Sequence, residues 1–159
     1  MNSVGSSSNG EFLKYQITKL QDLINQMVGC CEDKRLYQSR RFDLPYAELR
    51  CLMLFRTERY LTVKGIAQRL DVAKSRVTKL ISGLVRKGLV ESIEDPKDAR
   101  VKLISLTRKG KEKCKEIEVF QLEIHEKILS QFDPEERGHI MRALENLTMA
   151  METVKANLT

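Results

Sequence analysis

Basic and hydroxyl side chains gather at two places in the middle of the chain. Residues 74–79 contribute Lys74, Ser75, Arg76, Thr78 and Lys79, and a later segment contributes Asp98, Arg100 and Lys102. Arginine and lysine donate hydrogen bonds to phosphate oxygens and guanine edges, and serine and threonine hydroxyls reach either. These residue types fit a surface that binds a polyanion. An ordinary solvated helix face is the alternative interpretation.

The net charge of +6 is concentrated around these residues. Residues 60–111 hold 13 basic and 5 acidic residues, a net +8, whereas residues 1–59 carry +2 and residues 112–159 carry −4. A localised positive field favours a polyanionic partner, because each neutralised phosphate releases counterions. A lysine-rich solvated surface would show the same asymmetry, so charge alone does not decide between the two.

Two short helices and a hairpin are predicted to position these side chains. Thr62 caps a helix with apolar residues at 63, 66, 67 and 70, and residues 71–73 form a turn. A second helix runs from Lys74 to Lys87, ends at Gly88, and is followed by strands at 89–93 and 101–106. This order is that of a winged helix-turn-helix, whose second helix enters the major groove of DNA.

Amphipathic segments flank this unit in a fold that we expect to be mainly α. We expect a flexible tail at 1–10, an N-terminal helix and a loop within 11–43, the winged helix-turn-helix at 44–106, and C-terminal helices at 107–159. The loop occupies 32–43, and Asp43 or Leu44 caps the next helix, with Pro45 in its first turn. Thr107 caps one C-terminal helix, and residues 133–136 restart another.

The hairpin carries the most specific pattern. Residues 98–107 read D-A-R-V-K-L-I-S-L-T after Asp95-Pro96, and they resemble the D-x-R-x-x-x-(V/I)-x-L-T signature of the MarR family of bacterial and archaeal transcriptional regulators. The resemblance covers residues 44–111 closely and the flanking helices by layout. It implies that Arg100 reaches toward the minor groove and that Asp98 helps to hold it, whereas a surface ion pair within the turn is the alternative.

The sequence departs from the family at two positions. Ala73 stands where relatives often place a serine that caps the second helix, and Ala99 stands where many place another arginine. A missing serine cap typically costs about 1 kcal/mol unless another group, such as Asp71 or a water, replaces it. Both departures put the exact DNA contacts in doubt without arguing against the fold.

The resemblance also implies a homodimer that acts on a pseudo-palindromic, double-stranded DNA operator, with repression as the expected mode. Dimerisation is assigned to apolar stripes on the outer helices, which have no obvious partner within one chain. The residues are Leu13, Ile17, Leu20, Ile24, Ile140, Leu144, Leu147, Met151 and Val154. A small aromatic or anionic effector would bind near Arg40, Arg41, Phe42 and Tyr46, although a solvated loop with core anchors is the more ordinary interpretation.

Other functional classes receive less support from the sequence. The four cysteines, Cys30, Cys31, Cys51 and Cys114, lack C-x-x-C spacing, so we expect reduced thiols in a cytoplasmic protein with neither metal nor cofactor. The two histidines, His125 and His139, form no catalytic motif, and the longest apolar run, 51–55, is too short for a membrane span. A dimeric interaction protein and a thiol-based redox sensor on the same fold remain the alternatives to a non-enzymatic DNA-binding regulator.

Overall fold

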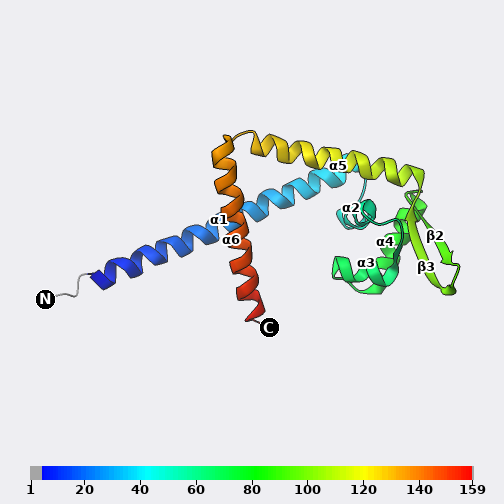
Figure 1. Cartoon of the computed structure of the whole chain (residues 1–159), viewed down its shortest axis with the longest axis horizontal. Coiled ribbons are helices and arrows are strands. Elements are labelled where there is room, and N and C mark those ends of the chain that lie inside the picture. The colour runs from blue at the N-terminus through cyan, green and yellow to red at the C-terminus, as the bar shows by residue number, and fades with distance from the viewer. Residues whose placement is uncertain (1–4, 159) are drawn as a thin grey trace. The chain divides into compact units, whose positions relative to one another are not determined.

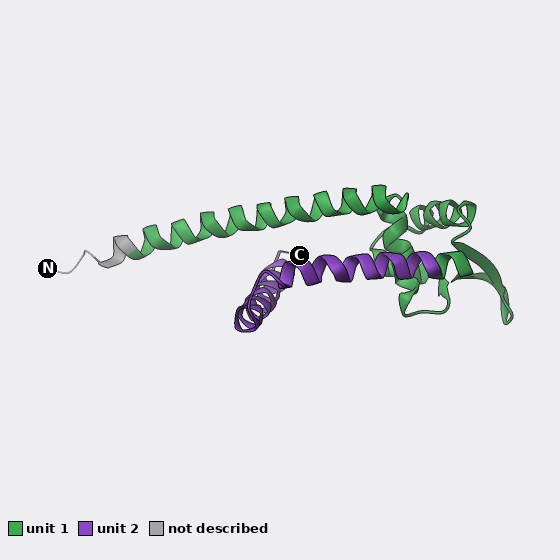
Figure 2. Cartoon of the chain, turned by 90° about the horizontal axis from the view of Figure 1, so that it is seen from above, with its two compact units in different colours: residues 1–111 green, residues 112–159 purple. Residues whose placement is uncertain are grey.

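The computed structural model describes residues 5–158, which form a mostly helical chain with one small sheet (Figure 1). The chain divides into two compact units, residues 1–111 and residues 112–159 (Figure 2). The first unit holds α1 (Gly5–Phe42) and the elements from α2 to β3, and the second holds most of α5 (Arg108–Leu129) and all of α6 (Pro134–Ala156). The expected mainly α winged helix-turn-helix is confirmed.

The winged helix-turn-helix consists of three helices and a three-stranded antiparallel sheet. Its elements are α2 (Tyr46–Met53), η1 (Leu54–Arg56), β1 (Leu61–Thr62), α3 (Val63–Leu70), α4 (Lys74–Arg86), β2 (Val90–Asp95) and β3 (Asp98–Leu106). The strand order is β1-β3-β2. The hairpin strands are thus longer than the predicted 89–93 and 101–106. The additional strand β1 was not predicted, because a segment of two residues shows no strand periodicity.

Local backbone signals fix the turn between α3 and α4. Thr62 Oγ1 accepts a hydrogen bond from Gly65 N at 3.0 Å, so the predicted cap is present. Asp71 ends α3 in the left-handed conformation, with φ 55°, and Gly88 follows α4 with φ 70°. Glycine at this second position avoids the strain that a Cβ atom would introduce there. The short turn therefore sets the direction in which α4 leaves α3.

The core of this unit lies between the inner faces of α2, α3, α4 and the sheet. Leu49, Leu52, Ile66, Val77 and Leu84 are all at most 1% exposed. On α4 the buried residues recur at spacings of four and three, as the amphipathic pattern predicts. Burial of such a side chain contributes roughly 1.5–3 kcal/mol, so the inner face holds α4 firmly in place.

The N-terminal helix is longer than the sequence predicts. α1 runs without interruption through 32–43 as far as Phe42, where we expected a loop, and it includes residues 5–10 of the expected tail. Residues 1–4 of that tail lie outside the described residues. Glu, Lys, Arg, Leu and Gln in the loop segment are good helix formers, and Gln38 and Phe42, four residues apart, are both buried. Glycine, serine and asparagine are weak helix formers, so the sequence of residues 5–10 did not indicate this extension of α1.

The start of α2 also differs from the prediction. Pro45 occupies the N-cap position instead of the first turn, and its carbonyl accepts from Leu49 N at 3.0 Å. Asp43 does not cap α2, because it lies beyond the end of α1 with φ 50°. Ser39 Oγ instead donates to Leu44 O at 2.7 Å across this corner. The α1–α2 corner is therefore held by α1 side chains and not by a cap on α2.

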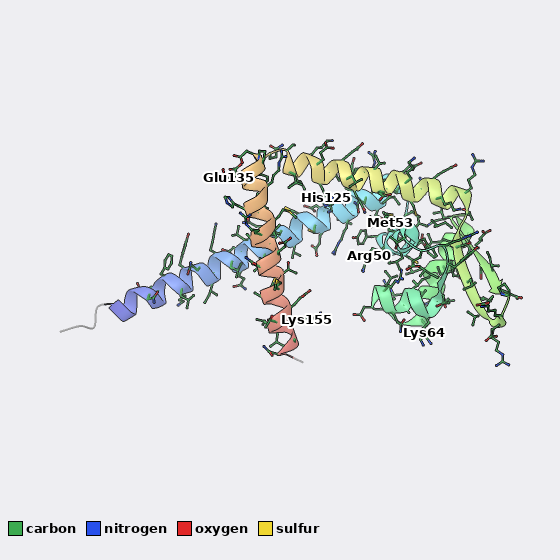
Figure 3. The ribbon with its side chains drawn as sticks, in the orientation of Figure 1. Arg50, Met53, Lys64, His125, Glu135 and Lys155 are labelled. Atoms are coloured by element: carbon green, nitrogen blue, oxygen red, sulfur yellow. The ribbon has the colours of Figure 1, made fainter. Side chains whose placement is uncertain are left out.

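The C-terminal helices begin as predicted. Thr107 Oγ1 accepts from Gly110 N at 3.0 Å at the start of α5. Asp133 and Glu136 form a reciprocal capping box at the start of α6, whose first turn also contains Glu135 (Figure 3). Arg137 Nε donates to Leu129 O and Phe132 O, so it satisfies carbonyls at the end of α5. These bonds define the turn between the two helices.

A buried carboxylate joins α2 to α4. Glu48 on α2 is 9% exposed and forms an ion pair with Lys87, the residue that caps the C-terminal end of α4. Gly83 on α4 provides the space for this carboxylate, since a Cβ atom there would come within 3.1 Å of Glu48 Cδ and closer still to Oε1. The small residue and the ion pair together allow the close approach of the two helices.

Two of the four cysteines belong to buried surfaces. Burial, reinforced by the charge of Glu48, raises the pKa of the Cys51 thiol to about 12. Burial, reinforced by Glu118, raises the pKa of Cys114 to about 11. Cys30 and Cys31 are exposed on α1. The thiolate is the reactive form, so Cys51 and Cys114 are chemically inert near neutral pH.

Replacing Gly83 by alanine tests the α2–α4 contact. Although alanine is the better helix former, we expect Gly83→Ala to lower the free energy of unfolding by about 1–3 kcal/mol, because the new Cβ displaces a buried, paired carboxylate. Denaturant unfolding at a fixed protein concentration measures the change. In a Glu48→Ala background the same substitution should cost much less. An equal cost in both backgrounds would show that Glu48 is not the group that requires glycine.

Thiol reactivity tests the assignment of the buried cysteines. In a variant carrying Cys30→Ser and Cys31→Ser, we expect the native protein to react negligibly with a thiol-specific chromogenic reagent between pH 7 and 9. The raised pKa values keep Cys51 and Cys114 protonated over this range. Both thiols should react once guanidinium unfolds the chain. Rapid reaction of either thiol in the native protein would contradict the burial described above.

Candidate nucleic-acid interface

The exposed face of α4 collects the predicted polar and basic side chains. All five predicted residues of this helix are exposed: Lys74, Ser75, Arg76, Thr78 and Lys79. Val77, Ile81 and Leu84 on the opposite side are buried in the core. The fold therefore presents a row of donors on a helix whose other face is fixed, and this is the arrangement that a groove-reading helix requires.

Two further residues continue this face beyond the predicted set. Ser82 and Arg86 are exposed and follow Ser75 at spacings of 7 and 11 residues. These spacings return to the same side of an α-helix, so Ser75, Lys79, Ser82 and Arg86 form one stripe along α4. The sequence analysis missed the last two because it considered only the first turn and a half. Extending the helical period would have found them.

The N-terminus of α4 is open. Ala73 occupies the N-cap position and provides no side-chain hydrogen bond, and Asp71 does not replace the missing cap. The expectation based on Ala73 is thus confirmed. A shallow depression beside this end is lined by residues of α3 and the turn, including Lys64, whose place on α3 is labelled in Figure 3. The lining of this depression includes the cations Lys64 and Lys74 and the carboxylate of Asp71.

The tip of the hairpin is shaped by two aspartates. Asp95 Oδ1 accepts from Lys97 N at 2.8 Å, and Asp98 Oδ1 accepts from Arg100 N at 3.0 Å. The pairing register passes from Glu94 opposite Lys102 to Asp95 opposite Asp98, so residues 99–101 face no partner on β2. Such an irregularity bends a strand and redirects its side chains. Arg100 lies at the centre of this irregular segment.

Asp98 contacts Arg100 through the backbone and not through an ion pair within the turn. The carboxylate binds the backbone N–H of Arg100 and makes no ion pair with its guanidinium in the described structure. Asp98 therefore fixes the backbone at the position of the arginine and leaves the guanidinium exposed. Lys102, also predicted, is exposed on the next regular part of β3.

The cations of both segments are free of internal partners. Within residues 5–158, Lys74, Arg76, Lys79, Arg100 and Lys102 take part in no ion pair, whereas Arg69 and Lys87 pair with carboxylates. Exposed cations without carboxylate neighbours keep their positive field directed at the solvent. Both the helix face and the hairpin tip can therefore offer charge-assisted hydrogen bonds to phosphates or base edges.

The predicted effector residues are spread over the α1–α2 corner. Phe42 is 8% exposed and belongs to the core, and the Arg41 guanidinium lies 5.8 Å from its ring centroid. Tyr46 is half-buried, and the guanidinium over its ring, at 5.3 Å, is that of Arg35. Arg40 is exposed. The arginine nearest Tyr46 is therefore one that the sequence analysis did not single out.

The predicted dimerisation stripes are largely uncovered. On α1, Leu13, Ile17 and Leu20 are 57%, 58% and 45% exposed, and Ile24 is half-buried. On α6 no residue is buried: Leu144, Met151 and Val154 are exposed, and Ile140 and Leu147 are half-buried. Apolar stripes of this length are typical of surfaces that another chain covers.

The described part of the chain contains no group of three or more His, Cys, Asp or Glu residues placed to hold a metal ion. None of the helices between residues 5 and 158 is both long enough and apolar enough to cross a bilayer.

Comparisons with known proteins agree with this geometry. A model of the MarR family matches residues 42–101, which span α2 to the middle of the hairpin. The transcriptional regulator AdcR of Streptococcus pneumoniae is 35% identical over 99 residues, covering 60% of this chain and 68% of AdcR. The HTH-type transcriptional regulator YwoH of Bacillus subtilis is 31% identical over 122 residues, covering 75% of this chain and 88% of YwoH.

Solved structures of MepR from S. aureus share the fold. One single-residue variant has a TM-score of 0.76 at 22% identity, covering 82% of this chain and 97% of MepR. Another variant, bound to an oligodeoxyribonucleotide, has a TM-score of 0.62 at 22% identity, covering 83% of this chain and 97% of that one. The relatives that share sequence and the neighbours that share the fold lead to one conclusion: this chain belongs to the MarR family.

Proposed function

We propose that the protein is a transcriptional regulator that binds a specific, pseudo-palindromic DNA operator as a homodimer and represses by occluding a promoter. The observation that carries this proposal is the set of unpaired cations on α4, held outward by a buried opposite face. Its relatives are regulators, and one structural neighbour is bound to an oligodeoxyribonucleotide. Proteins of this family are DNA-binding regulators and not enzymes.

In this proposal α4 enters the major groove. Cations at different positions along the helix come from Arg76, Lys79 and Arg86. Hydroxyl groups come from Ser75 and Thr78. The open N-terminus of α4 adds backbone N–H groups and the positive end of the helix dipole. These contacts divide into phosphate contacts, which position the helix, and base-edge contacts, which read the sequence.

The wing supplies the second contact. Asp98 and the irregular register at residues 99–101 hold Arg100 at the hairpin tip without neutralising its guanidinium. A narrow minor groove concentrates negative potential and attracts an inserted arginine. This arrangement supports a minor-groove contact for Arg100 and a contact with the adjacent phosphates for Lys102.

The apolar stripes of α1 and α6 support a homodimer. A second copy would cover both stripes and bring two α4 helices to one duplex, about one helical turn apart. A two-fold protein then matches a two-fold operator. The exposed apolar area has no comparable explanation in a monomer.

An effector and a redox role remain predictions. A small aromatic or anionic ligand at the α1–α2 corner would find arginines beside Phe42 and Tyr46. A thiol sensor would have to use Cys30 or Cys31, since Cys51 and Cys114 are buried with raised pKa values. A cytoplasmic location likewise stays an expectation.

Removing the wing arginine tests the minor-groove contact. We expect Arg100→Ala to weaken binding to a duplex selected from random DNA by about 10- to 100-fold per half-site, because a charge-assisted hydrogen bond contributes about 1.5–3 kcal/mol. Fluorescence anisotropy titration measures the affinity. Lys155→Ala, which removes the same charge from α6, serves as the control and should bind like the wild type. Equal affinities of all three proteins would remove Arg100 from the interface.

The salt dependence of binding tests the phosphate contacts of α4. We expect Lys79→Ala to reduce the slope of log K against log salt concentration by about 1 per subunit, because one fewer phosphate is neutralised. The loss should be similar for selected and unrelated duplexes, since phosphates carry no sequence information. A changed base preference with an unchanged slope would instead place Lys79 on a base edge.

A further inference from the structure

Two exposed hydroxyl groups on α4 donate hydrogen bonds to backbone carbonyl oxygens of the same helix. Thr78 Oγ1 donates to Lys74 O at 3.0 Å, and Ser82 Oγ donates to Thr78 O at 2.9 Å. A backbone carbonyl oxygen only accepts hydrogen bonds, so the single proton of each hydroxyl points back along the helix. In this rotamer each hydroxyl directs oxygen lone pairs to whatever lies outside the helix.

This orientation restricts what the two side chains can bind on a DNA duplex. Phosphate oxygens, guanine N7 and O6, and thymine O4 are all acceptors, so none of them complements a lone pair. The hydrogen-bond donors on the major-groove edge are the exocyclic amino groups, adenine N6 and cytosine N4. A hydroxyl in this state complements those amino groups and does not complement the backbone.

We propose that Thr78 and Ser82 are specificity-determining residues, each accepting a hydrogen bond from the amino group of an adenine or a cytosine in the major groove. The inference rests on the proposed function, in which α4 enters that groove. It separates these hydroxyls from the neighbouring cations, which donate to phosphates and guanines. The helix thus carries donors and acceptors side by side.

The positions of the two hydroxyls suit a single half-site. Both residues are exposed, and Ser82 lies on the same stripe as Ser75, Lys79 and Arg86. Four residues of α-helix advance about 6 Å, which is nearly two base-pair steps of about 3.4 Å each. We therefore expect Thr78 and Ser82 to reach different base pairs of one half-site.

Ser75 provides a matched comparison within the same helix. It is exposed on the stripe, and its hydroxyl makes no hydrogen bond in the described structure, so its proton remains available. Ser75 lies in the first turn of α4, where phosphates approach a helix N-terminus. We therefore expect Ser75 to act as a donor to the backbone, unlike the two hydroxyls whose protons are committed.

The test removes the proposed hydrogen bond in two ways, by changing the side chain that accepts it and by changing the base that donates it. The protein variants are Thr78→Val and Ser82→Ala, which remove the acceptor while keeping the helix surface close in shape. The DNA is the duplex that the wild type selects from a random pool, with single adenines replaced by purine and single cytosines by 2-pyrimidinone, which lack only the amino group. The adenine and cytosine arms identify which base each residue reads.

We expect the wild type to lose about 3- to 10-fold in affinity per deleted amino group at two positions of each half-site. Thr78→Val should be insensitive at one of these positions and Ser82→Ala at the other. Thr78→Ser, which keeps the hydroxyl, should retain the wild-type sensitivity, and so should Ser75→Ala. Thermal unfolding of each variant verifies that the fold is intact.

Two results would overturn the proposal, and they differ in their consequence. If the wild type selects a defined duplex but both variants remain as sensitive as the wild type to every deletion, Thr78 and Ser82 do not read amino groups, and the proposed function stands. If the wild type selects no sequence at all, both the inference and the proposed function are wrong.

Discussion

The position of the candidate binding surface depends on the close packing of α2 against α4. Val77, Ile81 and Leu84 bury the inner face of α4, and the missing side chain of Gly83 admits the carboxylate of Glu48, which pairs with Lys87 at the end of the helix. The buried apolar face holds α4 in place, and the ion pair of Glu48 with Lys87 adds a polar contact between α2 and the end of α4. Together these contacts leave the opposite face of α4 exposed to the solvent.

Charge is distributed so that it shapes the binding surface without neutralising it. The acidic residues of the hairpin tip, Asp95 and Asp98, bind backbone N–H groups and thereby define the turn, so Arg100 stays exposed. On α4 the hydroxyls of Thr78 and Ser82 donate to carbonyl groups of their own helix, and Lys74, Arg76 and Lys79 remain unpaired in the described structure. The carboxylates of Asp95 and Asp98 thus bind backbone N–H groups and do not pair with the nearby cations, which a polyanion can then contact.

The parts of the fold that depend on local signals could be predicted from the sequence. Thr62, Thr107 and Asp133 cap helices as expected, and Gly88 ends α4 with positive φ. Features that depend on distant contacts could not be predicted in this way: β1 consists of two residues that pair only with β3, and α1 continues through a polar segment because Gln38 and Phe42 are buried. Residue types indicate the candidate site, whereas the orientation of its hydroxyls and the backbone role of Asp98 depend on the three-dimensional structure.

The most direct test of the central claim is a competition titration of the wild-type protein at two salt concentrations. A labelled duplex selected from random DNA is displaced by the same duplex or by a scrambled duplex of equal composition. We predict two chains per selected duplex and a preference of at least about 1,000-fold over the scrambled one at physiological salt. Equal displacement by both duplexes, with binding that falls steeply as salt increases, would instead reveal a nonspecific polyanion-binding surface.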